Sequence, residues 1–233
     1  MRALILAAGE GRRMRPLTQI LPKPLIPVGG IPLIVRQILA LKKAGIDDFV
    51  VNVAHGGVVA RGLLGDGSEW GVRIRYSVEG NSSAEALETL GGIVKALPML
   101  ADADDEPFLV VAGDILTGYD YTKLVERGEA LARENLDAHL VLVPNPSYHR
   151  AGDMTLDGRG LVKRDSRDYT FSSLGVYRKG LFAGLSAERA SLFPWMWKAC
   201  EADRVSGEIF TGDWFNVGDA RELAAAEKRY VKN

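Results

Sequence analysis

Residues 1–30 read MRALILAAGEGRRMRPLTQILPKPLIPVGG. The apolar run over residues 3–8 is typical of a buried strand, and it ends abruptly at the Gly-Glu-Gly of residues 9–11. Three arginines and a lysine set between two prolines follow within residues 12–24. Because ligands of an open parallel sheet bind beyond the carboxyl ends of its strands, this order predicts an anion site directly after the first strand.

Short apolar runs alternate with helical patterns along the chain up to Pro146. The apolar runs predict strands over residues 3–8, 49–54, 72–78, 108–112 and 139–143. Helical spacing predicts helices over residues 32–44, 58–64, 92–100 and 121–135. This alternation favours an α/β fold with a Rossmann-like mixed, mostly parallel sheet and helices on both faces, in a single domain over residues 1–233.

The pattern changes beyond Pro146. Residues 154–163 predict a hairpin that turns at Asp157-Gly158, and residues 169–177 predict a further strand. Residues 194–202 and 220–230 predict the last two helices.

The bulk composition excludes several classes of partner. The chain has 233 residues and a net charge of −1, so its surface as a whole is not built for nucleic acid or an anionic membrane. Its one cysteine, Cys200, excludes a disulfide framework within one chain and favours a reducing, cytoplasmic setting. The N-terminus lacks the order of a signal peptide, and no apolar stretch reaches the roughly 18 residues of a membrane span. We therefore expect a cytoplasmic protein that contacts neither nucleic acid nor membrane.

The cationic loop differs from two familiar phosphate-binding loops. Met14 stands where the dinucleotide fingerprint needs a third glycine, and the Gly-Lys-Ser/Thr of the P-loop is absent. Gly9 and Gly11 let backbone N–H groups approach a ligand closely, and the arginines offer forked donors to phosphate oxygens. Lys23 supplies a point charge on a backbone that its flanking prolines restrict. A solvated surface loop is the alternative interpretation, but the position after a buried strand favours phosphate binding.

Residues 9–27, GEGRRMRPLTQILPKPLIP, closely resemble the signature of the sugar-phosphate nucleotidyltransferases. The family pattern is G-x-G-T/x-R-h-x-P-L-T followed by P-K-P-L-h-P, where h is apolar. The resemblance implies that Arg13 and Lys23 bind a nucleoside triphosphate and stabilise the charge that develops on it. It also implies a nucleotide site that includes Ala8, Gly9, Gly11 and Arg12.

The resemblance extends to two stretches that imply a metal site. Asp114 ends Val-Ala-Gly-Asp at the carboxyl end of a predicted strand, where a helix cap is the alternative role. In the family the Gly-Asp at this place supplies a metal ligand. Residues 212–219, GDWFNVGD, resemble the family's W-x-D-V-G-T, with Asn216 in place of the usual ligand aspartate. The implied cofactor is Mg²⁺, with Mn²⁺ as a substitute, held by Asp114 and Asn216, while Asp213 and Asp219 remain alternative ligands.

Further matches concern the base and the sugar. Residues 86–92, ALETLGG, resemble the L-E-T-G-G-G of one branch, in which small residues let the backbone read a pyrimidine, although Leu90 departs from that pattern. The implied base-side residues are Gly80, Glu88, Thr89 and Gly91. Residues 145–153 resemble the branch's N-P-x-x-H-x-x-G-D-F. The implied sugar-side residues are Asn145, Gly152, Asp153, Thr170 and Glu208.

Together these motifs are most similar to the uridylyltransferase branch that acts on N-acetylmuramate α-1-phosphate in cell-wall recycling. The resemblance implies a nucleotide-diphospho-sugar transferase fold that forms UDP-sugar and pyrophosphate from UTP and a sugar 1-phosphate. It divides the domain into a nucleotide-binding part, about residues 1–115, and a sugar-binding part, about residues 116–233. We expect a monomer or homodimer without the β-helix domain that many relatives carry at the C-terminus.

Two alternatives stay open. One is the same chemistry on mannose or glucose 1-phosphate with another nucleotide, as in a mannose-1-phosphate guanylyltransferase. The other is a non-catalytic subunit that binds a nucleotide sugar, which Leu90 and Asn216 motivate.

Overall fold

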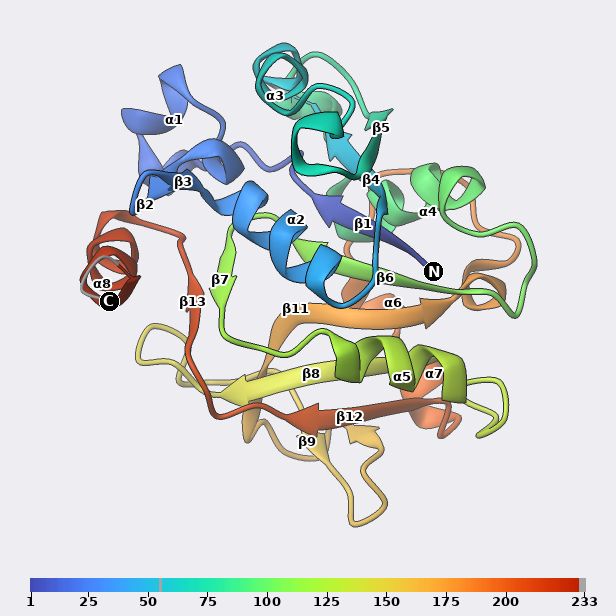
Figure 1. The fold of residues 1–233 in the computed structure, drawn as a ribbon. Coiled ribbons are helices and arrows are strands. Elements are labelled where there is room, and N and C mark those ends of the chain that lie inside the picture. The colour runs from blue at the N-terminus through green and yellow to red at the C-terminus, as the bar shows by residue number, and fades with distance from the viewer. Residues whose placement is uncertain (55, 231–233) are drawn as a thin grey trace.

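The computed structural model describes residues 1–54 and 56–230. Seven strands form the central sheet in the order β12-β8-β11-β6-β1-β4-β5 (Figure 1). The four adjacent strands β6, β1, β4 and β5 run parallel to one another. Strand β11 is antiparallel to both β6 and β8, and β12 is parallel to β8. Their bounds are β1 (Arg2–Leu6), β4 (Asp48–Val53), β5 (Arg73–Val78), β6 (Pro107–Ala112), β8 (Ala138–Pro144), β11 (Tyr169–Arg178) and β12 (Val205–Ile209). The predicted mixed, mostly parallel α/β sheet is confirmed.

Strand residues alternate between the two faces of the sheet, and helices cover both. In β1, Ala3 and Ile5 pack into one core and Leu4 packs into the other. Helices α2, α3 and α5 contribute to the first core, whereas α4, α6 and α7 contribute to the second (Figure 1). Their bounds are α2 (Leu33–Lys43), α3 (Gly57–Leu64), α4 (Glu88–Leu100), α5 (Thr122–Ala130), α6 (Leu192–Trp195) and α7 (Trp197–Glu201). Within the described residues, no helix combines the length and the apolar character needed to cross a membrane.

The opening segment and the C-terminal helix pack against each other. The terminal helix α8 (Ala220–Tyr230) packs beside the opening segment around a third core, in which Ala226 meets Met14 and Val28 (Figure 1). Three two-stranded ladders are β2 (Pro27–Val28) with β3 (Ile31–Pro32), β7 (Ile115–Thr117) with β13 (Trp214–Asn216), and β9 (Thr155–Leu156) with β10 (Val162–Lys163). The remaining short helices are η1 (Arg12–Met14), α1 (Leu17–Ile20), η2 (Lys23–Leu25), η3 (Ser68–Trp70), η4 (Ser83–Glu85) and η5 (Lys179–Phe182).

Several boundaries differ from those expected. Helix α4 begins at Glu88 rather than at residue 92, so the predicted base loop is partly the first turn of a helix. The single helix predicted over residues 194–202 is two short helices, and the backbone of Phe193, before Pro194, is extended. The predicted helix over residues 121–135 ends at Ala130. The hairpin is confirmed as β9 and β10.

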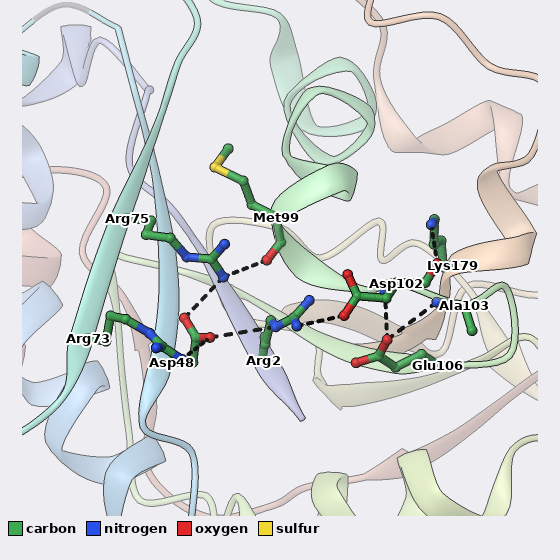
Figure 2. Close-up of polar contacts among 9 residues, drawn as sticks. All are labelled: Arg2, Asp48, Arg73, Arg75, Met99, Asp102, Ala103, Glu106 and Lys179. Atoms are coloured by element: carbon green, nitrogen blue, oxygen red, sulfur yellow. Dashed lines mark hydrogen bonds and ion pairs between the residues drawn. The ribbon is translucent and has the colours of Figure 1, made fainter.

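A polar network joins β1, β4 and β5 at their amino ends, opposite the edge that carries the opening loop. The buried carboxylate of Asp48 accepts hydrogen bonds from Arg73 at 2.8 Å and Arg75 at 3.1 Å, and Arg2 lies 3.5 Å away (Figure 2). Arg2 in turn donates to Asp102 at 2.8 Å. Three cations surround one buried carboxylate, so the network ties the first residues of three parallel strands together.

Candidate active site

A cavity of about 550 Å³ lies at the carboxyl ends of β1, β4 and β6. Residues 6–9, Asn52 and Ala112 line it from these three strands. Both parts of the chain contribute, because the cavity is also lined by Phe171, Ser173, Tyr177, Arg189, Ser191, Leu192 and Phe193. The cavity therefore occupies the edge at which open α/β sheets bind ligands. The predicted site residues that line it are Ala8, Gly9, Lys23, Glu88, Thr89, Asp114 and Asn216.

The opening loop folds back on itself before it reaches Lys23. Gly11 has a φ of +66°, and a Cβ there would lie 2.8 Å from the Thr18 side chain and 3.1 Å from Lys23. The hydroxyl of Thr18 donates to the Gly11 carbonyl at 2.9 Å. Gly11 thus lets the loop close against Lys23, and neither Gly11 nor Arg12 is among the residues that line the cavity.

The arginines of the loop have different surroundings. Arg12 and Arg15 both pair with Glu10, at 2.6 and 2.5 Å. Arg13 lies against the C-terminal motif, since a Cβ on Gly218 would be 2.8 Å from its Nη2. Arg13 is therefore the arginine that connects the opening loop with the segment that holds Asn216.

Lys23, Asp114 and Asn216 form one cluster in the cavity wall. Lys23 is buried and donates to Asp114. The pairing of β7 with β13 sets Asn216 opposite Ile115, and the N–H of Val217 donates to the Asp114 carbonyl at 3.1 Å. The Oδ1 of Asn216 is buried and has no hydrogen-bond partner among the described residues. An unpartnered amide oxygen beside a carboxylate is the donor set that a hard cation accepts, so these residues fit Mg²⁺.

The two alternative aspartates have other partners. Asp213 pairs with Arg229 at 2.6 Å. Asp219 accepts the N–H groups of Arg221 and Glu222, both at 2.9 Å, as the cap of α8. The geometry favours Asn216 over either of them as the neighbour of Asp114.

A buried bridge links the opening strand to the start of α4. Asn52 accepts the Ala7 N–H at 2.6 Å and donates to Glu79 at 2.6 Å. The second carboxylate oxygen of Glu79 accepts the Leu87 N–H at 2.7 Å. Both Asn52 and Glu79 line the cavity, and sequence reasoning missed them. Their signal was a polar residue close to the carboxyl end of each of two neighbouring strands, β4 and β5.

The glycines of the predicted base segment pack against the protein. A Cβ on Gly91 would lie 2.1 Å from the Glu188 carbonyl oxygen, and one on Gly92 would lie 2.5 Å from Glu79. A Cβ on Gly80 would likewise lie 2.3 Å from the Glu85 side chain. Leu90 is buried in the core beneath α4 rather than in the cavity wall.

The predicted sugar-side residues do not line the cavity. Asn145 donates to the Arg167 carbonyl at 2.9 Å and accepts the Thr170 hydroxyl at 2.8 Å. Asp153 accepts the Phe171 N–H at 2.9 Å. Gly152 fits against Asn145 with a φ of +61°. These contacts hold residues 145–153 against β11, and a role in binding sugar stays a prediction.

Glu208 lies apart from that group, on the edge strand β12. It accepts a hydrogen bond from the Tyr119 hydroxyl, and its carboxylate is 4.0 Å from His139. Burial lowers the pKa of His139 to about 4, so this histidine is neutral at physiological pH.

Residues outside the predicted set form the other wall of the cavity. Phe171 and Phe193 meet edge to face, with ring centroids 6.0 Å apart. Ser173 has a φ of +64° at an irregularity in the pairing of β11 with β8. Arg189 and Ser191 come from the segment before α6.

Comparisons with known proteins identify the family and the fold. Residues 2–166 match the nucleotidyl transferase family, so the chain belongs to that family. The expected family is thus confirmed. The chain is 43% identical over 231 residues to the N-acetylmuramate alpha-1-phosphate uridylyltransferase of Neisseria meningitidis serogroup B, with 97% of each chain covered.

Other relatives match over part of their length. A UTP–glucose-1-phosphate uridylyltransferase of Synechocystis is 37% identical over 131 residues, which are 54% of this chain and 34% of that protein. Among solved structures, a candidate glucose-1-phosphate thymidylyltransferase from Bacillus anthracis has a TM-score of 0.85 at 21% identity, covering 100% of this chain and 96% of that one. HddC from Yersinia pseudotuberculosis has a TM-score of 0.78 at 18% identity, covering 98% and 99%. The solved structures confirm the fold.

Proposed function

We propose that the protein transfers UMP from UTP to N-acetylmuramic acid α-1-phosphate. An oxygen of the sugar phosphate attacks the α-phosphorus, the bond from that phosphorus to the oxygen bridging it to the β-phosphorus breaks, and pyrophosphate leaves. A sugar phosphate is already deprotonated at neutral pH, so the step needs no general base. The supporting observations are the Lys23, Asp114 and Asn216 cluster in the cavity and the end-to-end similarity to the Neisseria uridylyltransferase.

The residues of the cavity, together with Arg13 outside its lining, suit the charge that such a step develops. Lys23 would direct its ammonium group at the α-phosphate, and Arg13 would approach the triphosphate from beside Gly218. Asp114 and the Oδ1 of Asn216 would hold Mg²⁺ together with phosphate oxygens and water. The metal supplies charge neutralisation on the phosphates. Positioning and electrostatics can carry such a reaction.

The test is a matrix of reactions in which each nucleoside triphosphate is paired with each sugar 1-phosphate and pyrophosphate release is measured. We expect the highest kcat/KM for UTP with N-acetylmuramic acid α-1-phosphate, and no release in excess chelator. A preference for GTP with mannose 1-phosphate would replace the substrate assignment. Binding of nucleotide sugars without any release would establish the non-catalytic alternative.

A further inference from the structure

Five charged side chains line the cavity: Lys23, Glu79, Glu88, Asp114 and Arg189. Lys23 is paired with Asp114, and Glu79 belongs to the bridge from Asn52 to Leu87. Glu88 begins α4. Arg189, in the segment before α6, is the remaining cation of the cavity wall among the described residues.

The contacts of Arg189 leave most of its hydrogen-bonding capacity unused. Its Nε donates to one carboxylate oxygen of Glu88 at 3.0 Å, and its terminal nitrogens have no hydrogen-bond partner among the described residues. The other oxygen of Glu88 accepts the Ser191 hydroxyl. Both partners of the ion pair are well exposed, at 60% for Arg189 and 41% for Glu88. A single-contact ion pair exposed to solvent is weak, and the hydrogen bond from Ser191 to Glu88 does not depend on Arg189.

Hydrogen bonds hold the backbone around Arg189, whereas its side chain is mostly exposed. Ala190 donates to the Leu87 carbonyl at 3.0 Å, and its own carbonyl accepts the Leu90 N–H at 2.9 Å. The neighbouring Glu188 carbonyl packs on Gly91, where a Cβ would lie 2.1 Å away. Glu88 itself has a φ of +58°, an unusual conformation for a non-glycine residue that these contacts maintain. The guanidinium is therefore presented from a rigid base at the cavity rim.

The proposed sugar substrate offers a group that matches these free donors. N-acetylmuramic acid differs from N-acetylglucosamine by a lactyl ether on O3, and its carboxylate is ionised at neutral pH. An arginine binds a carboxylate through two parallel N–H···O bonds, which gives direction as well as affinity.

We propose that Arg189 binds the lactyl carboxylate of the sugar and exchanges its contact with Glu88 for that carboxylate. This inference rests on the proposed function. The Ser191 hydroxyl and then Arg189 lower the pKa of Glu88, so Glu88 stays ionised. Without Arg189, an ionised Glu88 would face the ligand carboxylate and repel it, which makes the arginine a specificity residue for this sugar acid.

The test uses the intact protein with matched ligands and variants. Calorimetry gives Kd for UDP-N-acetylmuramic acid and for UDP-N-acetylglucosamine, and kinetics give kcat/KM for N-acetylmuramic acid 1-phosphate with UTP. Arg189→Ala should weaken UDP-N-acetylmuramic acid binding about 10- to 100-fold, as for loss of a hydrogen-bonded charge pair, and change UDP-N-acetylglucosamine binding less than about threefold. Arg189→Lys should restore part of the loss. Arg164→Ala removes an arginine of similar exposure that pairs with Glu201 outside the cavity, and should change neither Kd.

Equal losses for the two nucleotide sugars, or no loss for either, would overturn the role of Arg189 while leaving an active wild type as a uridylyltransferase. A wild type that neither forms nor binds UDP-N-acetylmuramic acid would overturn the proposed function, and the inference with it. The two failures are therefore distinguishable.

Discussion

At the scale of single residues, the proposed function gives Lys23 the central electrostatic role. Its ammonium group is buried in the cavity wall beside Asp114, where a cation acts with little screening by solvent. We expect Lys23→Ala to lower kcat by about 100-fold or more, since loss of one charge-stabilising donor has that effect, while the fold survives. Steady-state kinetics and thermal melting measure the two properties. Lys43→Ala, an exposed lysine outside the cavity, is the control, and near-wild-type turnover of Lys23→Ala would remove the proposed role.

In the proposed metal site, Asn216 would determine how strongly metal binding depends on nucleotide. Its neutral Oδ1 adds no charge to that of Asp114, so we expect Mn²⁺ to bind weakly to the free protein and tightly with UTP present. Asn216→Asp should strengthen Mn²⁺ binding to the free protein because a carboxylate adds Coulomb attraction at short range. Asn216→Ala should raise the Kd for Mn²⁺ on the order of tenfold, as for loss of one interaction with a charged group.

Calorimetric titration with Mn²⁺, with and without UTP, measures these effects. Asp213→Ala is the matched control, because Asp213 pairs with Arg229. An unchanged titration for Asn216→Ala, together with a shifted one for Asp213→Ala or Asp219→Ala, would assign the second ligand to one of those aspartates.

At the scale of elements, the bridge of Asn52 and Glu79 connects β1 with the first turn of α4. Glu79 accepts hydrogen bonds from Asn52 and from the Leu87 N–H. We expect Glu79→Gln to raise KM for UTP about tenfold, because an amide N–H₂ must face one of these two donors and the buried mismatch costs about 1–3 kcal/mol. The effect on kcat should be smaller. Glu106→Gln, at the opposite edge of the sheet, is the control, and an unchanged KM for Glu79→Gln would show that the bridge does not position the nucleotide site.

The strands that the sequence predicted most directly are those buried along almost their whole length. The long apolar runs of β1, β4, β6 and β8 are buried on both faces, so their pattern follows from packing alone. Strand β12 lies at the edge of the sheet, and β7 and β13 have three residues each. Such short or edge strands form because they pair with strands far away in the sequence, and the local pattern of apolar residues does not predict that pairing.

At the scale of the whole molecule, the network of Asp48 ties β1, β4 and β5 together at the edge remote from the cavity (Figure 2). Burial raises the pKa of Asp48, but hydrogen bonds from Arg73 and Arg75 outweigh it, so the net shift is downward. A lowered pKa stabilises the fold above the unfolded-state value of about 3.9, and that stabilisation is lost as the pH falls through the lower folded-state pKa.

We therefore expect Asp48→Asn to destabilise the protein by about 1–3 kcal/mol at pH 7 and by progressively less below about pH 4. Denaturant unfolding at several pH values measures the difference between variant and wild type. Asp104→Asn, in the exposed loop before β6, is the control. A difference that grows on acidification would contradict the sign of the pKa shift.

The two walls of the cavity differ in how far the sequence predicted them. Asp114 closely follows the buried strand β6, and Lys23 belongs to the segment that follows β1, so their positions followed from the rule for parallel sheets. Arg189 reaches the cavity through a segment that packs on Glu88, 101 residues earlier in the chain, and no local pattern marks such a contact. Asn145 and Asp153 matched a motif, yet their side chains bond to the backbone of β11 and its preceding loop.

The most direct test of the whole account is a crystal structure with UDP-N-acetylmuramic acid and Mn²⁺, with the metal located by its anomalous scattering. We predict a Mn²⁺ peak between the carboxylate of Asp114 and the Oδ1 of Asn216, the diphosphate beside Lys23, and the sugar on the wall that carries Phe171 and Arg189. A nucleotide sugar bound outside this cavity, or a Mn²⁺ peak on Asp213 or Asp219, would contradict it.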